Sequence, residues 1–143
     1  MSAALRPMTI EDYDGVFALW QASEGVGLSA ADERAEIARY LARNPGLSQV
    51  ATVDGRLAGA VLCGHDGRRG YIHHLAVAAE CRGRGIGREL VARCMEGLAA
   101  AGISRCHIFV YTRNTEGQGF WRAIGWTLRD DLAVMSRQTR PEG

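Results

Sequence analysis

The chain has 143 residues, of which 47% are apolar and 23% are charged. This length and composition suit one domain with a hydrophobic core, residues 1–143, and exclude a disordered chain. The formal net charge of +1 excludes a global field that would favour nucleic acid or an anionic membrane, so we expect neither as a partner.

No apolar run approaches the length of a transmembrane helix, and the start "MSAALRPMTIEDYD" lacks the apolar core of a signal peptide. We therefore expect a cytoplasmic protein. The cysteines are widely spaced and form no CxxC pair, so we expect buried small side chains rather than a zinc site or a redox pair, and no bound metal. They are Cys63, Cys81, Cys94 and Cys106.

The first predicted elements are a short edge strand at residues 4–6 and a helix. Thr9 has the features of a helix N-cap, and Asp12 stands three residues on as the partner in a capping box. The apolar residues after it follow helical spacing, which indicates one buried face. They are Tyr13, Val16, Phe17 and Trp20.

A second helix is predicted after the break at "SEGVG" (residues 23–27). Ser29 and Asp32 repeat the capping signal, and Ile37, Tyr40 and Leu41 mark the apolar face. The helix should end at Asn44, because the proline that follows disfavours helical geometry in the residue before it.

Three consecutive strands are predicted in the middle of the chain. The segments 48–53 and 56–64 flank Asp54-Gly55, a strong hairpin turn. A second Asp-Gly turn in "HDGRRG" leads to the strand "YIHHLAV" at 71–77. We expect these three strands to form an antiparallel meander.

The pattern becomes helical over residues 88–101, and Gly102 is placed to end that helix. Its apolar face is formed by Leu90, Val91, Cys94 and Leu98. The strand "HIFVY" (107–111) follows, and a strand, a helix and another strand indicate a right-handed parallel crossover. A weaker helix is predicted at 115–124, and "LAVMSR" (132–137) is predicted as the last strand.

Between the third strand and the long helix lies the loop "RGRGIG", residues 82–87. The first amides of a helix lack partners within it, the helix dipole adds positive charge, and glycines permit close approach. These features favour an anion site suited to a phosphate or diphosphate. A plain glycine-rich turn with solvated arginines is the alternative, and the pattern alone leaves both open. The loop is neither a Walker A motif nor a dinucleotide fingerprint.

The stretch "LAVAAECRGRGIGRELV" resembles the acetyl-CoA motif of the GCN5-related N-acetyltransferase (GNAT) superfamily, an apolar strand followed by [RQ]-x-x-G-x-[GA] and a helix. Arg82, Gly85 and Gly87 stand at its defining positions. A second signature, N-x-x-A-x-x-F-Y-x-x-x-G-F, is approximated by "NTEGQGFWRAIGW". It keeps Asn114, Phe120 and Gly125 and departs at Gly117, Trp121 and Trp126.

The resemblance implies an α/β fold with a mixed, mostly antiparallel central sheet, a splayed parallel strand pair and helices on both faces. It implies that acetyl-CoA lies between the two splayed strands, with its diphosphate on the loop amides and its arm along the edge of "LAV". The amide of Val77 would then face the thioester carbonyl. The implied cofactor-binding residues are Leu75, Ala76, Val77, Arg82, Gly83, Arg84, Gly85, Ile86, Gly87, Arg88, Asn114 and Trp121.

An amine acceptor must lose a proton before it attacks, so a base is needed. Strand alternation predicts that Tyr71, His73, Leu75 and Val77 share one face and that Ile72, His74 and Ala76 share the other. By that logic His73 points to the reacting centre, and some branches of the family resemble this with a histidine or glutamate there. A satisfied, partly buried histidine is the alternative for His73, and it is our interpretation of His74.

The resemblance would place a tyrosine, often the acid that protonates the thiolate, where this chain has Trp121. An indole N–H is no practical proton source at neutral pH, and we interpret Trp121 as packing against the cofactor arm or the core. Three explanations stay open: the thiolate leaves unprotonated, Tyr71 or Tyr111 substitutes, or the protein binds acyl-CoA and catalyses poorly. Tyr111 ends its predicted strand opposite His73, which makes it a candidate catalytic residue.

The function predicted from these features is acetyl transfer from acetyl-CoA to an amine by direct attack in a ternary complex. A non-catalytic acyl-CoA sensor and a toxin-like acetyltransferase acting on charged tRNA are the alternatives, and the near-neutral charge argues against the second. The sequence does not identify the acceptor, which could be a metabolite, a peptide N-terminus, a lysine or an antibiotic. The oligomeric state also stays open, with a homodimer as one alternative.

Overall fold

The computed structural model describes residues 3–140, which divide into two compact units after Tyr111. The first unit contains the sheet and most of the helices, and the second, from Thr112, contains one helix. Each unit is described by itself, and the predicted single-domain organisation stays a prediction. No helix among the described residues has both the length and the apolar character needed to cross a membrane.

Strands, α-helices and short 3-10 helices alternate along the first unit. In chain order they are β1 (Ala4–Pro7), η1 (Ile10–Asp12), α1 (Tyr13–Gln21), η2 (Ala30–Asp32), α2 (Arg34–Arg43), β2 (Gln49–Val53), β3 (Arg56–His65), β4 (Gly70–Val77), η3 (Ala79–Cys81), α3 (Ile86–Ala100) and β5 (Cys106–Ile108). This order confirms the predicted edge strand, both N-terminal helices, the meander and the long helix. Thr9 caps η1, which runs directly into α1, but Ser29 caps only η2. The predicted cap of the second helix is therefore wrong, because α2 begins after the extended residue Glu33.

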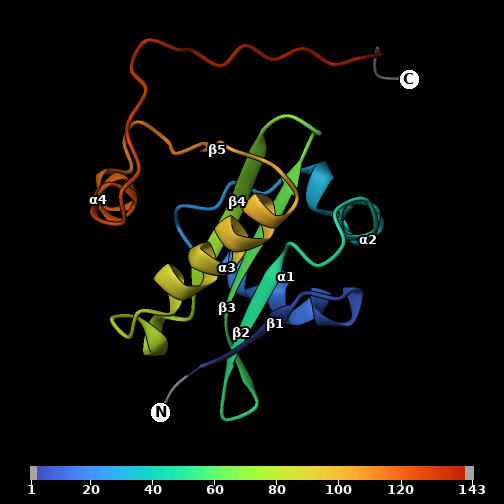
Figure 1. The fold of residues 1–143 in the computed structure, drawn as a ribbon. Coiled ribbons are helices and arrows are strands. Elements are labelled where there is room, and N and C mark those ends of the chain that lie inside the picture. The colour runs from blue at the N-terminus through green and yellow to red at the C-terminus, as the bar shows by residue number, and fades with distance from the viewer. Residues whose placement is uncertain (1–2, 141–143) are drawn as a thin grey trace. The chain divides into compact units, whose positions relative to one another are not determined.

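The strands form one sheet in the order β1-β2-β3-β4-β5 (Figure 1). The first three pairings are antiparallel, and β4 and β5 are parallel, joined by α3 as a crossover. The predicted mixed sheet with a parallel pair is therefore confirmed. Asp54 and Gly55 connect β2 and β3 with φ angles of 52° and 76°, the left-handed geometry that a two-residue hairpin requires.

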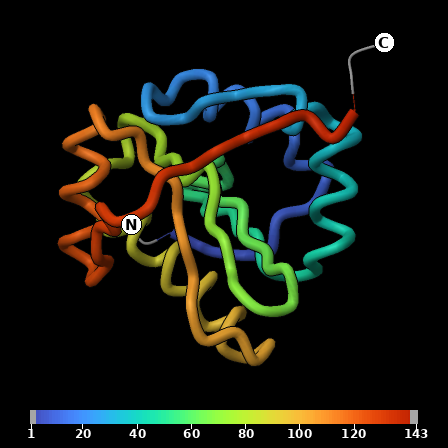
Figure 2. The backbone as a smooth tube through the Cα atoms, turned by 90° about the horizontal axis from the view of Figure 1, so that it is seen from above, coloured from blue at the N-terminus to red at the C-terminus, as the bar shows by residue number. Residues whose placement is uncertain are grey.

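Helices cover both faces of the sheet. A Cβ at Gly59 of β3 would meet the side chains of Leu90 and Ile86, which places α3 on that face. On the other face Ala60 and Leu62 pack with Trp20 and the rest of the cluster formed by α1, α2 and β2. Figure 2 shows α3 on one side of the strands and the segment containing α1 on the other.

β4 contains one more residue than β3 does over the same stretch. Ala60 pairs with Ala76 and Leu62 pairs with His73, so one residue of β3, Val61, opposes two of β4, His74 and Leu75. This β-bulge contains His74, which has a φ of 56°. A left-handed conformation costs a non-glycine residue roughly 1–2 kcal/mol, so other contacts must hold it.

β5 is shorter than predicted. Its pairing with β4 covers Gly70 with Cys106, Tyr71 with His107 and Ile72 with Ile108, and the strand ends there. The prediction of a strand through residue 111 is thus wrong for its last three residues. β4 continues to Val77 without β5 beside it, so the two strands part after Ile72.

The second unit contains α4 (Thr115–Ala123), which confirms the weaker helix predicted there. Asn114 caps it: the side-chain oxygen accepts the backbone N–H of Gly117 at 2.9 Å. The predicted strand "LAVMSR" is wrong, because residues 132–137 form no strand. Alternating apolar residues favour a strand only where a neighbouring edge pairs with them, and these residues pair with none within the described part of the chain.

Candidate functional site

A row of unpaired backbone donors lies between η3 and α3. The N–H groups of residues 83–88 donate to no backbone or side-chain acceptor within residues 3–140, whereas those of Arg82 and Glu89 on either side donate to Ala79 and Gly85. Six consecutive donors at the start of a 15-residue helix form a region of positive potential that suits an anion.

Two glycines give this loop its shape. Gly83 and Gly85 have φ angles of 79° and 81°, a region that side chains disfavour, and a Cβ at either would meet no atom within 4 Å. Among the described residues, nothing therefore obstructs close approach at these two glycines. The side chains of Arg84 and Arg88 are exposed, and both add positive charge to the loop.

Arg82 connects the loop to the end of β4. Its Nε donates to the carbonyl of Val77 at 3.1 Å, although the side chain is exposed. The bond also shows that the carbonyl of Val77 points away from β3. Ala78 donates to Ala58 of β3 at 2.8 Å, and hydrogen bonding alternates along an antiparallel strand. The N–H of Val77 therefore also points away from β3, into the space that β5 leaves.

An aromatic cluster lies where β4 and β5 part, and consists of Tyr71, His73 and Phe109. The ring centroids of Tyr71 and His73 are 6.3 Å apart, and each lies 6.1 Å from that of Phe109. The three rings are nearly parallel, with interplanar angles of 7° to 21°. Phe109 is 61% exposed, so the cluster reaches the surface of the first unit.

His73 is held in a state that can accept a proton. Burial lowers the pKa of its imidazole, and the neighbouring His74 acts in the same direction while Asp32 opposes it. A lowered pKa keeps the ring neutral near pH 7, as a base requires.

The prediction that the side chains of His73 and Val77 lie on the same face of the sheet is wrong. Paired residues in an antiparallel sheet project to the same face. His73 pairs with Leu62, which faces α1 and α2, whereas Val77 pairs with Gly59, which faces α3. The bulge reverses the alternation between them. Ala76 likewise lies in the core on the α1 side instead of opposite His73.

Tyr111 does not end a strand, because β5 stops three residues earlier. Its hydroxyl lies against the Cα of Gly27 in the connection between α1 and η2, so close that a side chain at Gly27 would collide with it. The structure thus brings Tyr111 to the α1–η2 connection. Glu24 in the same connection is exposed.

Asn114 and Trp121 lie in the second unit. The Asn114 side-chain oxygen is occupied by the α4 cap, which leaves its amide nitrogen for other contacts. Trp121 packs edge-on against Trp126, with ring centroids 4.9 Å apart, and against Phe120 at 5.3 Å. Trp121 is therefore an aromatic packing residue within its own unit.

The sequence analysis did not predict the contact between the side chains of Asp32 and His74. His74 Nε2 lies 2.8 Å from Asp32 Oδ1, and the two side chains are 18% and 6% exposed. The signal for Asp32 was present in the capping box, which requires a carboxylate there, but nothing in the sequence linked it to β4. Among the described residues no group of three histidine, cysteine or acidic side chains could hold a metal ion.

Comparisons with known proteins agree with this geometry. The profile of the Acetyltransferase (GNAT) family matches residues 13–126. An acetyltransferase of Pectobacterium atrosepticum is 31% identical over 127 residues, 89% of each chain.

Solved structures share the fold. Ard1 of Thermoplasma volcanium has a TM-score of 0.79 at 20% identity, covering 90% of this chain and 85% of that one. The PaiA N-acetyltransferase of Thermoplasma acidophilum, solved in complex with coenzyme A, has a TM-score of 0.77 at 19% identity, covering 91% and 92%. The family match over most of the chain and the relative of 31% identity lead to one conclusion: this protein belongs to the acetyltransferase (GNAT) family, and its cofactor is acetyl-CoA.

Proposed function

We propose that this protein transfers an acetyl group from acetyl-CoA to an amine acceptor by direct attack in a ternary complex. The observation that carries the proposal is the row of six unpaired amides at residues 83–88, which stands beside the parted strands β4 and β5. A diphosphate fits the amide row, because the open glycines let it approach and the arginines add charge. An extended arm fits along the free edge of β4.

Two groups of β4, the backbone N–H of Val77 and the ring of His73, take part in the proposed reaction. Acetyl-CoA supplies the acetyl group as a thioester. The N–H of Val77, which points into the gap, donates to the carbonyl oxygen on which charge develops during attack. Because this N–H lies in the plane of the sheet, its role does not depend on the face that the Val77 side chain takes.

His73 is the proposed base, acting directly or through a water molecule. Its ring lies at the mouth of the gap on the α1 side, and its lowered pKa leaves it neutral and able to take a proton from the ammonium. Tyr111 is the proposed acid for the leaving thiolate, since its hydroxyl belongs to the first unit and Trp121 has no suitable proton. Cofactor contacts by Asn114 and Trp121 stay predictions, as do the single-domain organisation, the cytoplasmic location and the oligomeric state.

A thiol-release screen tests this function. Purified protein is incubated with acetyl-CoA and a panel of small amines, amino acids and short peptides, and coenzyme A release is followed spectrophotometrically. We expect release that depends on one class of amine. His73→Gln should lower kcat by about 10²- to 10⁴-fold, the usual contribution of a general base, while coenzyme A still binds.

His65→Gln is the matched control, because His65 is the last residue of β3 and its Nδ1 accepts the N–H of Gly67 in the following turn at 3.0 Å. We expect it to leave turnover unchanged. Equal rates in the two variants would remove His73 from the mechanism.

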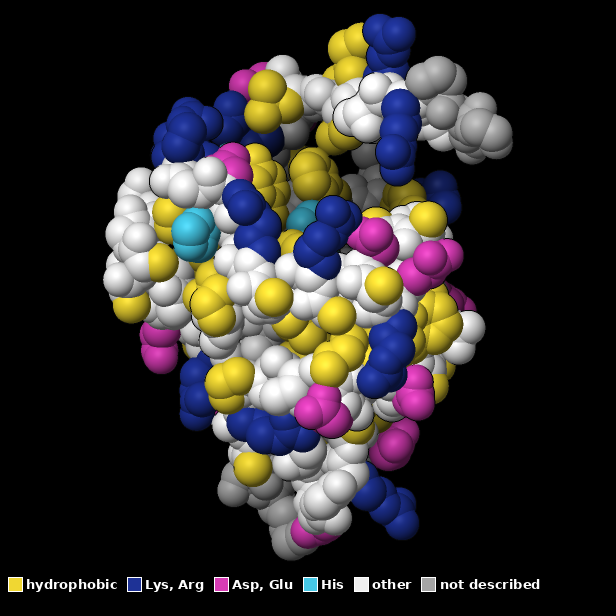
Figure 3. All heavy atoms as spheres, turned by 90° about the vertical axis from the view of Figure 1, so that its right-hand side faces the viewer, with side chains coloured by type: hydrophobic (Ala, Val, Ile, Leu, Met, Phe, Trp, Pro, Cys, Tyr) yellow, Lys and Arg dark blue, Asp and Glu magenta, His cyan; other side chains and the backbone are white. Residues whose placement is uncertain are grey.

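A non-catalytic acyl-CoA sensor is the second candidate, and Trp121 at the position of the usual tyrosine favours it. Calorimetry that shows tight acetyl-CoA binding, with no thiol release across the whole panel, would decide for the sensor. A partner nucleic acid has less support. Acidic and basic side chains are mixed on the face shown in Figure 3, and the formal net charge is +1. RNA binding that falls steeply with salt would contradict this.

A further inference from the structure

The bulge in β4 is held by a residue far away in the sequence. His74 has a left-handed backbone, with φ at 56°, at a position where the chain has a large side chain rather than glycine. Its Nε2 lies 2.8 Å from Oδ1 of Asp32 in η2. A carboxylate only accepts, so the imidazole is the donor. The pair connects the α1–α2 segment to the strand that borders the gap.

Asp32 is itself fixed from two sides. Its Oδ2 accepts the backbone N–H of Ser29 at 3.0 Å, and its carbonyl accepts the hydroxyl of Tyr13 at 2.7 Å. The residue is 4% exposed. Asp32 is therefore anchored through its carboxylate to the start of η2 and through its carbonyl to α1.

The backbone of His74 has a second anchor. The indole N–H of Trp20, a side chain with no exposed surface, donates to the carbonyl of His74 at 2.8 Å. The two rings pack edge-on with centroids 5.0 Å apart. Side chain and carbonyl of the bulged residue are thus both bound to the helical layer on the α1 side.

We propose that Asp32 and His74 form a positioning pair for acetyl transfer, which holds the β4 bulge and thereby aims the Val77 N–H and the His73 ring at the gap. The inference rests on the proposed function, since it assigns those two groups their roles. His74 is at the bulge, and the three residues after it carry the free edge of β4. If the bulge relaxed, the register of residues 75–77 would shift, and every side chain and amide beyond it would change direction.

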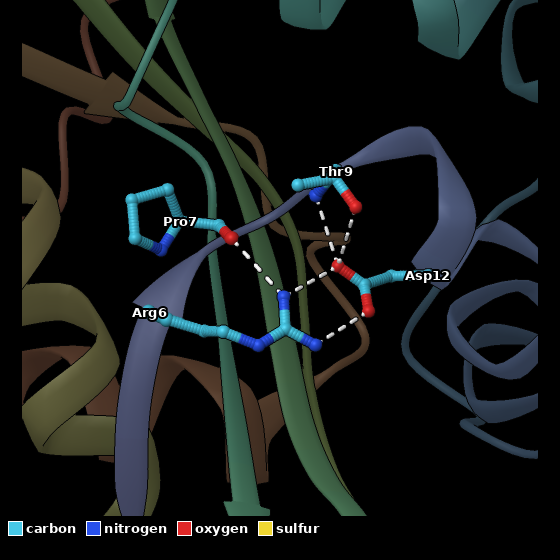
Figure 4. A network of polar contacts seen from close by, with 4 residues as sticks. All are labelled: Arg6, Pro7, Thr9 and Asp12. Carbon is cyan, nitrogen blue, oxygen red and sulfur yellow. Dashed lines mark hydrogen bonds and ion pairs between the residues drawn. The ribbon is translucent and has the colours of Figure 1, made fainter.

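The chain contains a matched control for Asp32. Thr9 and Asp12 form the same capping box at η1 that Ser29 and Asp32 form at η2, and the Asp12 carboxylate accepts the N–H of Thr9 at 2.9 Å. The carboxylate also accepts the hydroxyl of Thr9 at 3.5 Å and two bonds from Arg6 at 2.7 and 2.8 Å, as Figure 4 shows. Asp12→Ala therefore removes an equivalent cap that has no bond to β4.

The experiment compares Asp32→Ala, Asp12→Ala and the double variant Asp32→Ala/His74→Gly, with kcat and KM measured well below each melting temperature. We expect kcat to fall about tenfold to a hundredfold in Asp32→Ala, as for a small misplacement of reacting groups, and to hold in Asp12→Ala. The double variant should recover most of the loss, because glycine adopts the left-handed conformation without an anchor. Equal kcat in the two alanine variants, or no recovery, overturns the proposal.

If Asp32→Ala does not fold, His74→Gly and His74→Val replace it. Both lack the imidazole, but only glycine tolerates the left-handed backbone. The proposal expects the glycine variant to retain much more activity than the valine variant, and equal activities would refute it.

The backbone amides give a readout that does not depend on turnover. In the ¹⁵N–¹H spectrum, signals of residues 76 and 77 should shift in Asp32→Ala, stay in place in Asp12→Ala and return in the double variant. If no amine is acetylated but these shifts occur, the proposed function fails, and what stands is that Asp32 and His74 hold the bulge. If transfer is observed but the shifts are absent, the pair fails alone.

Discussion

Replacing Gly85 with alanine tests the amide row at the start of α3 directly. Gly85 is the N-cap of that helix with φ at 81°, and Gly102 follows the other end of the same helix with φ at 83°. A Cβ at either position would meet no atom within 4 Å. The two substitutions therefore impose the same backbone strain without a steric clash, at opposite ends of one helix.

The expected losses of stability and of coenzyme A affinity follow from the structure. Each alanine should cost about 1–2 kcal/mol of unfolding free energy, the price of a left-handed alanine, which is a decrease of roughly 3–8 °C in melting temperature. When the backbone relaxes to relieve that strain, the change at Gly85 turns the unpaired amides of residues 83–88 away from the anion. The change at Gly102 does not, because it lies at the other end of α3. One hydrogen bond to a charged group contributes about 1.5–3 kcal/mol, so coenzyme A should bind about tenfold to a hundredfold more weakly.

Isothermal titration calorimetry with coenzyme A measures the affinity, and differential scanning calorimetry measures the stability. We expect Gly102→Ala to lose stability and keep wild-type affinity, and Gly85→Ala to lose both. Equal affinities in the two variants would refute the assignment of the diphosphate to residues 83–88. If Gly85→Ala is as stable as the wild type, the left-handed conformation itself is wrong.

Three further predictions concern single side chains. The ion pair with Arg6 lowers the pKa of Asp12, so its stabilisation is complete above the ordinary carboxyl pKa and is lost as the pH falls through the lower folded value. Asp12→Asn should cost about 1 kcal/mol in urea unfolding at pH 7 and nothing near pH 2; a constant difference contradicts this. Trp20→Phe leaves the carbonyl of His74 without a donor and should cost about 2–4 kcal/mol of unfolding free energy; a loss below 1 kcal/mol contradicts that bond. Burial lowers the pKa of His73, so its imidazole NMR signal should titrate with a midpoint below about 6.5. The signal is assigned by its loss in His73→Gln, and a higher midpoint would contradict the role of His73 as a base.

Local signals predicted most of the first unit. Asp54-Gly55 demanded a tight hairpin, the two capping boxes marked the short 3-10 helices η1 and η2 ahead of α1 and α2, and Gly102 ended α3, because each depends on a few neighbouring residues. The loop at 82–88 was recognisable for the same reason. These features require no knowledge of what lies across the fold.

The predictions that were wrong depended on distant partners. A period-two pattern cannot reveal one inserted residue, and the bulge at His74 is held by Asp32 and Trp20, which lie more than forty residues earlier. The strand at 132–137 fails similarly, since alternating apolar residues form a strand only where an edge accepts them. β5 ends at Ile108, where its pairing with β4 stops at Ile72, and no residue of "HIFVY" indicates this.

The inserted residue in β4 also explains why the strand pair parts where it does. A bulge bends its strand and increases the local twist. The bulge lies between His73 and Ala76, directly beyond Ile72, the last residue of β4 that pairs with β5. β3 follows the bend because it pairs with β4 on both sides of the bulge, whereas β5 has no pairing past that point. Without the insertion β4 would continue straight, β5 would gain a partner, and the edge amides would bind a strand in place of a ligand.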